Sequence, residues 1–324
     1  MKVSVVIPVY GVEKYIARCA KSVLEQTYVD KEIIFVDDAS PDNSMTVLNE
    51  LLKNYTIPVK ILHHPVNRGL AAARKTGIEA STGEYIVSVD SDDYSEPRAL
   101  ELLAAKALSS QSDVVRMGCF IEWKNKQIVY NGPWSSNPKE YSRLLISGKT
   151  LPGICFHMMR RELYEQADCH FIEGLNYAED YVVSTRLCWA ANSIAQVEQP
   201  LYHYDQSNLE SMAHTIRPNQ IRNMIQAFDV LSDFFKDKPG CNDALQAGRW
   251  LKKTEHIMIA NRADYALVDT IPCNRPINTS SMNGLQVIAA YLMALRLWNI
   301  LWLYCRSLEG LLKIKQNLRK ACSI

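Results

Sequence analysis

Residues 85–93 read Tyr85-Ile86-Val87-Ser88-Val89-Asp90-Ser91-Asp92-Asp93, an apolar run followed by four residues with three carboxylates. Such a run is typical of a strand buried in a sheet. Because residues two apart in an extended segment point to the same side, we expect Asp90 and Asp92 to share one face and Asp93 to face away. We expect all three carboxylates to lie outside the core.

Two interpretations of the acidic residues 90–93 are open. Two carboxylates at ~4 Å repel by about 1 kcal/mol in water, and by more when they are partly desolvated. A hard divalent cation with oxygen ligands removes this repulsion and commonly keeps phosphate oxygens as further ligands. The stretch therefore indicates a metal that holds a nucleotide diphosphate. The alternative is a polar turn in which Ser91 and Asp93 are ordinary turn formers.

Strands and helices alternate before residue 110. Strands are expected at 3–9, 32–37, 59–62 and 85–90, and helices at 13–26, at 70–80 and after the start signal Ser40-Pro41. This alternation predicts a parallel sheet covered on both faces, with ligands at the carboxyl ends of its strands. Four residues lie at such ends: Tyr10, Asp37, Asp38 and Asp90.

The pattern changes after residue 110. Strands are expected at 113–117, 154–159 and 195–204, with a hairpin formed by 120–123 and 127–130 and a helix at 177–191. From residue 220 the chain is predicted to be helical, and residues 269–284 are typical of a linker. We therefore expect three units, at residues 1–110, 111–218 and 219–324.

Composition narrows the class of protein. The 324 residues are 48% hydrophobic and 22% charged, which excludes a disordered or fibrous chain. A net charge of +1 does not indicate nucleic acid as a partner. The nine cysteines show no CxxC pair, as expected for reduced thiols in a cytosolic protein. The first ten residues are typical of a strand and not of a signal peptide, so we expect a cytoplasmic protein.

Five motifs follow one another in a characteristic order. They are Val5-Val6-Ile7-Pro8-Val9-Tyr10, Ser22-Val23-Leu24-Glu25-Gln26-Thr27 leading into Glu32-Ile33-Ile34-Phe35-Val36-Asp37-Asp38-Ala39-Ser40, Asn67-Arg68-Gly69-Leu70-Ala71-Ala72-Ala73-Arg74, Gly83-Glu84-Tyr85-Ile86 and Asp90-Ser91-Asp92-Asp93. Together they resemble the family 2 glycosyltransferases with the GT-A fold. The resemblance is dense over residues 1–110 and continues thinly to about residue 215.

The resemblance implies an α/β fold: a GT-A (Rossmann-like) nucleotide-sugar-binding domain with a mixed sheet, plus a C-terminal helical extension. The nucleotide sugar would bind residues 1–110 and the acceptor residues 111–218. The implied activity is that of an inverting, metal-dependent glycosyltransferase of the hexosyltransferase type. It would move a sugar from a nucleotide-diphosphate sugar, UDP-linked by expectation, to a hydroxyl of a glycan or lipid-linked acceptor in surface polysaccharide synthesis. The implied cofactor is Mn²⁺ or Mg²⁺.

By the same resemblance, the donor site comprises Pro8, Val9, Tyr10, Asp38, Gly69, Arg74, Asp90 and Ser91, with Asp92 and Asp90 at the metal. Pro8, Val9 and Tyr10 would line the nucleobase pocket and Asp38 would hydrogen-bond the base. Asp90 would contact the ribose, and Asp92 would coordinate the metal. Asp38 could instead be an acidic helix entry favoured by the helix dipole. We favour the base-binding role because Ser40 already supplies the expected helix cap.

Three residues before and within the third helix have open roles. Gly69 is expected to allow close backbone approach to a ligand, since it has no Cβ. Arg68 and Arg74 are candidates for neutralising the acidic residues or the diphosphate. Arg74 is equally compatible with a solvated helix position.

Asp180 is the expected catalytic base. Inverting transfer needs a group that accepts the proton of the acceptor hydroxyl. The segment Gly174-Leu175-Asn176-Tyr177-Ala178-Glu179-Asp180 resembles the Glu-Asp motif of the family, whose aspartate has this role. A structural interpretation competes, because Asn176 suits an N-cap and Glu179 a capping-box partner. Glu179 therefore stays open between structure and function.

Tyr202-His203-Tyr204 and Ser211-Met212 resemble a family segment that closes over the diphosphate. The family often has arginine after the second tyrosine, whereas this chain has Asp205, which leaves the phosphate contact in doubt. His203 and His214 are open as further metal ligands. His63 and His64 are not expected to be ligands.

The C-terminal region contains the apolar stretch 285–305, followed by the basic residues Lys313, Lys315, Arg319 and Lys320. Gln286, Arg296 and Asn299 interrupt the stretch and disfavour a membrane span. An interfacial helix within 285–320, at the cytoplasmic face of a membrane, fits better. A core helix or a homodimer helix is an equal alternative.

Two other functions compete with glycosyl transfer. A sugar-phosphate nucleotidyltransferase also uses an α/β fold, acidic residues and Mg²⁺, but it requires a glycine-rich phosphate loop with a basic residue after the first strand. The segment Tyr10-Gly11-Val12-Glu13 contains no such loop. An inactive, glycosyltransferase-like binding module is disfavoured by the intact acidic set of Asp38, Asp90, Asp92 and Asp180.

Overall fold

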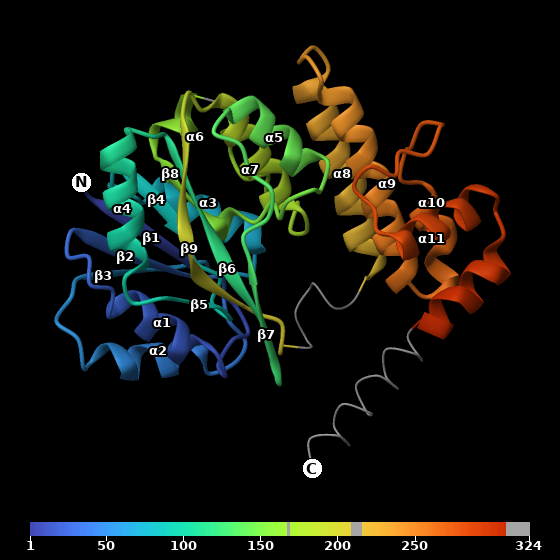
Figure 1. Ribbon diagram of the computed structural model, residues 1–324. Coiled ribbons are helices and arrows are strands. Elements are labelled where there is room, and N and C mark those ends of the chain that lie inside the picture. The colour runs from blue at the N-terminus through green and yellow to red at the C-terminus, as the bar shows by residue number, and fades with distance from the viewer. Residues whose placement is uncertain (167–168, 209–215, 309–324) are drawn as a thin grey trace.

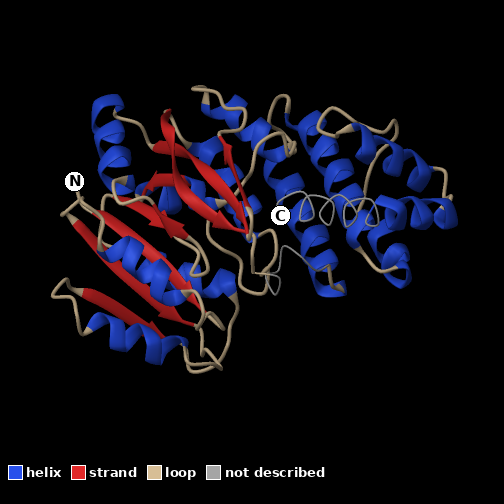
Figure 2. Cartoon of the chain, turned by 60° about the horizontal axis from the view of Figure 1, so that its bottom comes forward, coloured by secondary structure: helices blue, strands red, loops and turns tan. Residues whose placement is uncertain are grey.

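The computed structural model describes residues 1–166, 169–208 and 216–308. A twisted mixed sheet with helices on both faces forms one part of the molecule, and a wholly helical part packs beside it (Figures 1 and 2). The expected α/β architecture with a mixed sheet and C-terminal helices is confirmed.

Nine strands form one sheet in the order β3-β2-β1-β4-β8-β6-β9-β5, with β7 paired to β6. Their bounds are β1 (Val3–Val9), β2 (Lys31–Asp37), β3 (Val59–His63), β4 (Tyr85–Ser88), β5 (Tyr94–Ser95), β6 (Val114–Trp123), β7 (Lys126–Tyr130), β8 (His157–Arg160) and β9 (Ile194–Asp205). Strands β1 to β4 are parallel, and β8 runs antiparallel to both β4 and β6. The strand order reverses at β1, so its carboxyl end and that of β4 flank the crevice where ligands bind in such sheets.

Helices cover both faces of this sheet. Their bounds are α1 (Ile16–Leu24), α2 (Ser44–Leu52), α3 (Leu70–Glu79), α4 (Ala99–Ser110), α5 (Pro138–Ile146), α6 (Glu162–Gln166) and α7 (Glu179–Ala190), with a 3-10 turn at Ile154–Phe156. Helices α1, α2 and α4 share one hydrophobic core with β1, β2 and β4. Helices α3, α5, α6 and α7 share another core on the opposite face. Both faces of the central strands are therefore buried, as their apolar runs predicted.

The helical part has a core of its own. It comprises α8 (Pro218–Phe235), α9 (Cys241–Ile259), α10 (Tyr265–Asp269) and α11 (Gly284–Ala294), with a 3-10 turn at Arg262–Asp264. Tyr181 and Val182 of α7 pack into this core beside Phe228, so α7 belongs to both parts. A residue near the start of α7 therefore lies where the sheet and the helical part meet.

Three expected helix boundaries are wrong. Helix α2 begins at Ser44 and not after Ser40, because Asp42 accepts hydrogen bonds from the backbone N–H and the hydroxyl of Ser44. Ser40 instead accepts a hydrogen bond from the Gly11 N–H. The single helix expected over 285–305 breaks after α11, where Arg296 adopts a positive φ of 56° and a second helical segment follows. The third correction concerns α7, whose cap is Ala178 and not Asn176.

No helix in the described residues is long and apolar enough to cross a membrane. The eight cysteines in these residues form no disulfide, and Cys322 lies outside them.

Candidate active site

An open cleft of about 1290 Å³ lies at the carboxyl ends of β1 and β4. The sheet forms one wall, and α7, α8 and α9 contribute to the other. The residues assigned to the donor, the metal and the catalytic base line this cleft: Pro8, Val9, Tyr10, Asp38, Gly69, Arg74, Asp90, Ser91, Asp92 and Asp180. Arg68, the other candidate for the diphosphate, instead pairs with Glu173 at 2.9 Å. Tyr10 is 49% exposed, so much of its ring is open to a ligand.

The carboxylates of the acidic turn after β4 differ in their burial and in their contacts. Asp90 and Asp92 are half-buried, and the Asn208 amide donates to Asp92 Oδ2 over 3.1 Å. Burial, with the neighbouring Asp90 charge, raises the pKa of Asp92. A bound cation would relieve the part of this pKa shift that comes from repulsion between the two carboxylates.

Asp93 corrects the expectation that all three carboxylates lie outside the core, because it is only 1% exposed. Its carboxylate accepts hydrogen bonds from the Tyr202 hydroxyl at 2.8 Å and the Asp205 N–H at 2.7 Å. These bonds satisfy the buried group and fasten the turn to β9. Asp93 is thus a buried residue that joins the turn to β9, and not an ordinary turn former.

Arg18 of α1 is a residue that the sequence analysis missed. Its guanidinium donates to the Asp92 carbonyl at 2.8 Å and pairs with Asp205 at 2.6 Å. It also lies over the Tyr94 ring, 4.4 Å from the centroid. The Asp205 carboxylate, at the position where the resemblance led us to look for an arginine, therefore binds an arginine that comes from α1.

Asp38 is buried at the base of the Tyr10 side of the cleft. Its carboxylate accepts from the Arg68 N–H at 2.9 Å and the Gly69 N–H at 2.7 Å, and His64 Nδ1 lies 2.6 Å away. Asp38 thus holds the loop before α3, whatever further bond it makes. The argument that favoured Asp38 as a base contact is weakened, because Ser40 does not cap α2.

Gly69 lies in close contact with Asn176. Its φ is +91°, and an added Cβ would stand 2.1 Å from the Asn176 amide nitrogen. Asn176 Oδ1 accepts from the Ala71 N–H at 3.2 Å, so it binds the start of α3 and not of α7. The close approach expected at Gly69 is therefore made to the protein itself.

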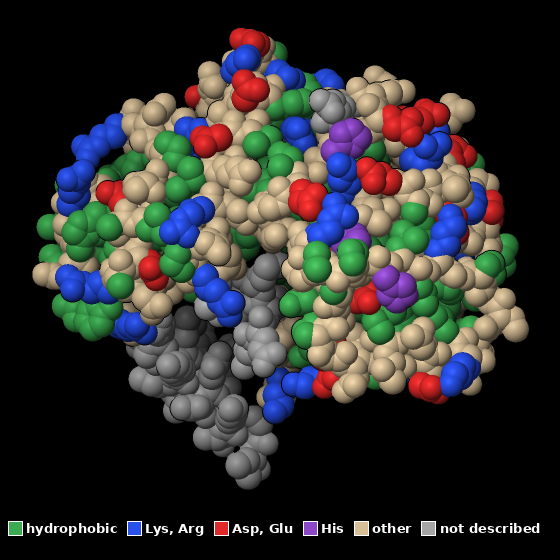
Figure 3. Space-filling view, turned by 180° about the vertical axis from the view of Figure 1, so that it is seen from behind, with side chains coloured by type: hydrophobic (Ala, Val, Ile, Leu, Met, Phe, Trp, Pro, Cys, Tyr) green, Lys and Arg blue, Asp and Glu red, His purple; other side chains and the backbone are tan. Residues whose placement is uncertain are grey.

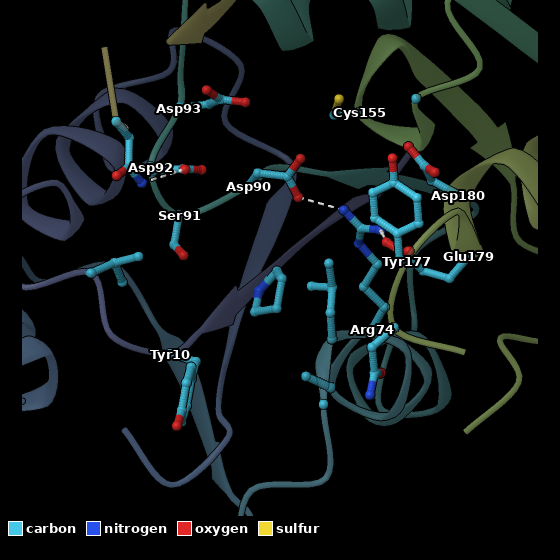
Figure 4. A pocket seen from close by; sticks show the side chains of 18 of the residues that line it. Tyr10, Arg74, Asp90, Ser91, Asp92, Asp93, Cys155, Tyr177, Glu179 and Asp180 are labelled. Carbon is cyan, nitrogen blue, oxygen red and sulfur yellow. Dashed lines mark hydrogen bonds and ion pairs between the residues drawn. The ribbon is translucent and has the colours of Figure 1, made fainter. Parts of the chain in front are cut away.

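Arg74 is 2% exposed, which excludes the solvated-helix interpretation. Its guanidinium donates to Asp90 at 2.6 Å and to Glu179 at 2.5 Å, and Figure 4 shows it reaching between Asp90 and the Glu179–Asp180 side of the cleft. Burial would lower the pKa of Arg74, but the surrounding carboxylates outweigh it and the pKa is raised. One permanent cation thus neutralises part of a carboxylate cluster.

Asp180 faces the cleft from the first turn of α7. One carboxylate oxygen accepts from the Tyr181 N–H at 2.7 Å. Burial raises the pKa of Asp180, the Arg74 charge opposes the shift, and the Asp90 charge adds to it. Burial likewise raises the pKa of Glu179, against the effect of Arg74. Glu179 makes an ion pair, whereas Asp180 has an oxygen available to a ligand.

Helix α9 supplies a wall that the sequence analysis missed. Lys252, Glu255, His256 and Ile259 line the cleft and are spaced so that they share one helix face. That spacing was the signal in the sequence. Burial lowers the pKa of His256 to about 4, and its Nδ1 donates to the Lys252 carbonyl at 2.7 Å. His256 is therefore neutral, and Nε2 is a hydrogen-bond acceptor.

The histidines raised as possible ligands have other contacts. His203 lies between Glu96 and Glu122, at 2.7 and 2.8 Å, and stacks on Tyr94. His63 pairs with Asp37 at 3.0 Å. His214, with Ser211 and Met212, lies outside the described residues.

The acidic turn fits a hard divalent cation only in part. Carboxylate oxygens of Asp90 and Asp92 are suitable ligands, but three or more His, Cys, Asp or Glu side chains do not converge as a metal site within the described residues. A cation held here would thus need oxygen ligands from a bound phosphate.

Known proteins are similar to this chain in sequence and in fold. EpsJ of Bacillus subtilis, described as an uncharacterized glycosyltransferase, is 31% identical over 209 residues, which are 62% of this chain and 60% of EpsJ. The chain thus spans less than two thirds of that relative.

Two solved structures share the fold. S. aureus TarS (residues 1–349) in complex with UDP has a TM-score of 0.69 at 19% identity, over 96% of this chain and 92% of that one. The mannosyltransferase PcManGT of Pyrobaculum calidifontis, in complex with GDP-Man and Mn²⁺, has a TM-score of 0.55 at 17% identity, over 94% and 84%. The GT-A fold expected from the sequence is confirmed.

The sequence profile of the family described as "Glycosyl transferase family 2" matches residues 4–167, half of the chain. The match covers the first four strands, the acidic turn and Arg74. This chain therefore belongs to glycosyltransferase family 2.

Proposed function

We propose that this chain transfers a sugar, with inversion, from a UDP-linked donor to a hydroxyl of a glycan or lipid-linked acceptor in surface polysaccharide synthesis. The observation that carries the proposal is the placement of the acidic turn and Asp180 on opposite sides of one cleft. Donor-binding oxygen ligands and a carboxylate of raised pKa thus meet across a space that both substrates can enter. The UDP held by the similar TarS structure supports the choice of nucleotide.

Each residue around the cleft has its own role in this proposal. Tyr10, whose ring is exposed in the cleft, would stack on the nucleobase, and Asp90, which lines the same cleft, would contact the ribose. Asp92 and Asp90 would hold Mn²⁺ or Mg²⁺, which supplies positive charge for the departing diphosphate. Asp180 accepts the proton of the acceptor hydroxyl. At the same time the oxygen of that hydroxyl bonds to the anomeric carbon of the sugar, and the bond from the anomeric carbon to the nucleotide diphosphate breaks.

Two substitutions separate donor binding from catalysis. Asp180→Asn should lower turnover by about 10²–10⁴ and leave donor affinity nearly unchanged, because it removes only the proton acceptor. Asp92→Asn should weaken Mn²⁺-dependent donor binding by at least about tenfold. Donor binding by calorimetry and release of UDP from a panel of UDP-sugars, with and without acceptor glycans, measure both effects.

Asp229→Asn, a substitution of an exposed aspartate on α8, is the matched control and should behave as the unmodified protein. Normal turnover in Asp180→Asn would remove Asp180 from the mechanism. Binding of UDP-sugar without any release of UDP, across donors and acceptors, would favour the inactive binding module instead.

A further inference from the structure

Helix α11 presents apolar side chains to solvent. Leu285, Ile288 and Tyr291 are 49%, 48% and 52% exposed and follow each other at intervals of three residues. The opposite side of the helix, with Ala289 and Met293, is buried in the helical core. The exposed stripe is therefore additional to the core that the helix needs for folding.

The segment that follows α11 repeats this arrangement. Leu297, Ile300 and Leu303 are exposed at the same spacing, and the Tyr304 hydroxyl donates to the Leu285 carbonyl over 3.0 Å. That bond places the two helical segments side by side as a hairpin of residues 284–308. Seven of the sixteen large hydrophobic residues exposed in the described part of the chain lie within residues 285–303. A concentration of this kind marks an interaction surface.

The charged residues of the hairpin, and of the segment that leads into it from residue 270, are all arginines. Residues 270–308 contain no Asp or Glu, and their charged residues are Arg275, Arg296 and Arg306. Trp298 and Trp302 are partly buried beside the exposed leucines. Figure 3 shows the helical part from behind, at the left, where hydrophobic side chains lie among those of Lys and Arg and a few of Asp and Glu. Apolar, aromatic and basic side chains together are the composition of a surface that lies on anionic lipid.

A second copy of the chain is a poorer partner for the hairpin. A two-fold dimer would place this surface against itself. Arginines would then face arginines, and residues 270–308 offer no carboxylate to pair with them. An anionic lipid surface supplies the missing negative charge.

The hairpin adjoins the cleft. Ile259, at the end of α9, lines the cleft and is half exposed, and Arg262 just beyond it donates to Asn299 of the hairpin. The apolar surface therefore begins near the rim of the cleft, beside the wall that α9 forms. A lipid surface that covers the hairpin would bring its headgroups close to the cleft opening.

We propose that residues 284–308 dock on an anionic bilayer surface, with the exposed leucines and isoleucines among the headgroups and the arginines on lipid phosphates. Docking delivers a lipid-linked acceptor to the cleft. Only this last consequence rests on the proposed glycosyltransferase function; the docking itself does not.

Co-sedimentation of the full chain with vesicles tests the docking. Vesicles containing phosphatidylglycerol should bind the protein, vesicles of phosphatidylcholine alone should bind it more weakly, and salt should weaken the binding. The triple variant Ile288→Ser, Tyr291→Ser, Ile300→Ser should lower partition by at least about tenfold, because it removes three large apolar side chains from the interface. Arg296→Glu should lower binding to the anionic vesicles alone.

The matched control is Val29→Ser, Leu108→Ser, Val129→Ser, which changes three apolar residues outside the hairpin that are more exposed than those of the hairpin variant. This control should keep vesicle binding. Absence of binding to the anionic vesicles, or an equal loss in the control, would overturn the proposal. So would a self-association, measured by sedimentation velocity without lipid, that the hairpin variant abolishes. Release of UDP in solution, measured in parallel, tests the transferase function separately.

Discussion

Asp180 experiences opposing electrostatic effects. Burial and the Asp90 carboxylate raise its pKa, whereas Arg74 opposes this rise. The net result is a base that holds a proton more tightly than an ordinary aspartate. A carboxylate of raised pKa accepts a proton from a hydroxyl more readily, provided that it is ionised at the working pH.

The pH dependence of turnover follows from this shift. Only the ionised Asp180 accepts a proton, so kcat should be full above its raised pKa and fall as the pH drops through it. The acid limb should therefore lie above the usual range of an aspartate. Initial rates at saturating donor and acceptor, across a pH series, give this limb.

The slow residual turnover of Asp180→Asn should lack that acid limb, since asparagine does not titrate. A limb that persists unchanged in this variant would assign the titration to another group. Glu179, whose pKa burial also raises, would be the next candidate.

At the scale of elements, the start of α3 is held by a contact between the two halves of the sheet domain. Gly69 and the Ala71 N–H both contact Asn176, which lies just before α7. Residues distant in sequence thus fix the loop before α3 against the segment that leads into α7. Gly69 is required for its positive φ and for the absence of a Cβ.

Gly69→Ala and Gly174→Ala separate these two requirements. Gly174 has a similar φ of +87° but no atom within 4 Å of an added Cβ. Each substitution should cost about 1–2 kcal/mol of unfolding free energy for the left-handed backbone. Gly69→Ala should cost about 1–3 kcal/mol more, because its Cβ overlaps Asn176.

Urea denaturation of both variants measures the difference. Equal losses of stability would mean that Asn176 moves aside without cost.

The sequence was most informative where local pattern determines structure. The apolar runs of β1 and β4 end directly at Tyr10 and Asp90, so strand ends and acidic turn could be predicted together. Ser40 and Asn176 have the residue types of N-caps, yet their side chains bind the Gly11 and Ala71 N–H groups instead. The residue type of an N-cap does not reveal which backbone N–H, distant in sequence, its side chain will bind.

The pairing of Arg74 could not be predicted for the same reason. Glu179 lies 105 residues away in sequence, and only the folding of the sheet domain brings the two charges together. The polar stripe of Lys252, Glu255 and His256 was visible as spacing on α9. Its position in the cleft depends on how the helical part docks on α7.

For the whole molecule, we expect the donor to stabilise the folded chain, because it would bind in the cleft between the sheet and the helical part. A ligand that binds only the folded chain raises stability by about 2.7 kcal/mol at a concentration 100 times its Kd. UDP with Mn²⁺ should therefore raise the melting temperature, and EDTA should reverse the rise. Differential scanning fluorimetry measures both.

In Asp92→Asn the Mn²⁺-dependent part of this stabilisation should be lost, while Asp229→Asn should keep it. Equal stabilisation by UDP with Mn²⁺ and with EDTA would show that nucleotide binding needs no metal.

The position of Arg74 between two carboxylates bears on the order of donor binding and proton transfer. Its single charge is shared between Asp90, on the donor side, and Glu179, on the side of the base. A change of charge at either carboxylate alters the share left for the other. If a donor binds at Asp90 as proposed, its arrival should change the proton affinity of the Glu179–Asp180 pair, and by reciprocity protonation of that pair should change the affinity for the donor. The shared cation would then couple donor binding to deprotonation of the acceptor.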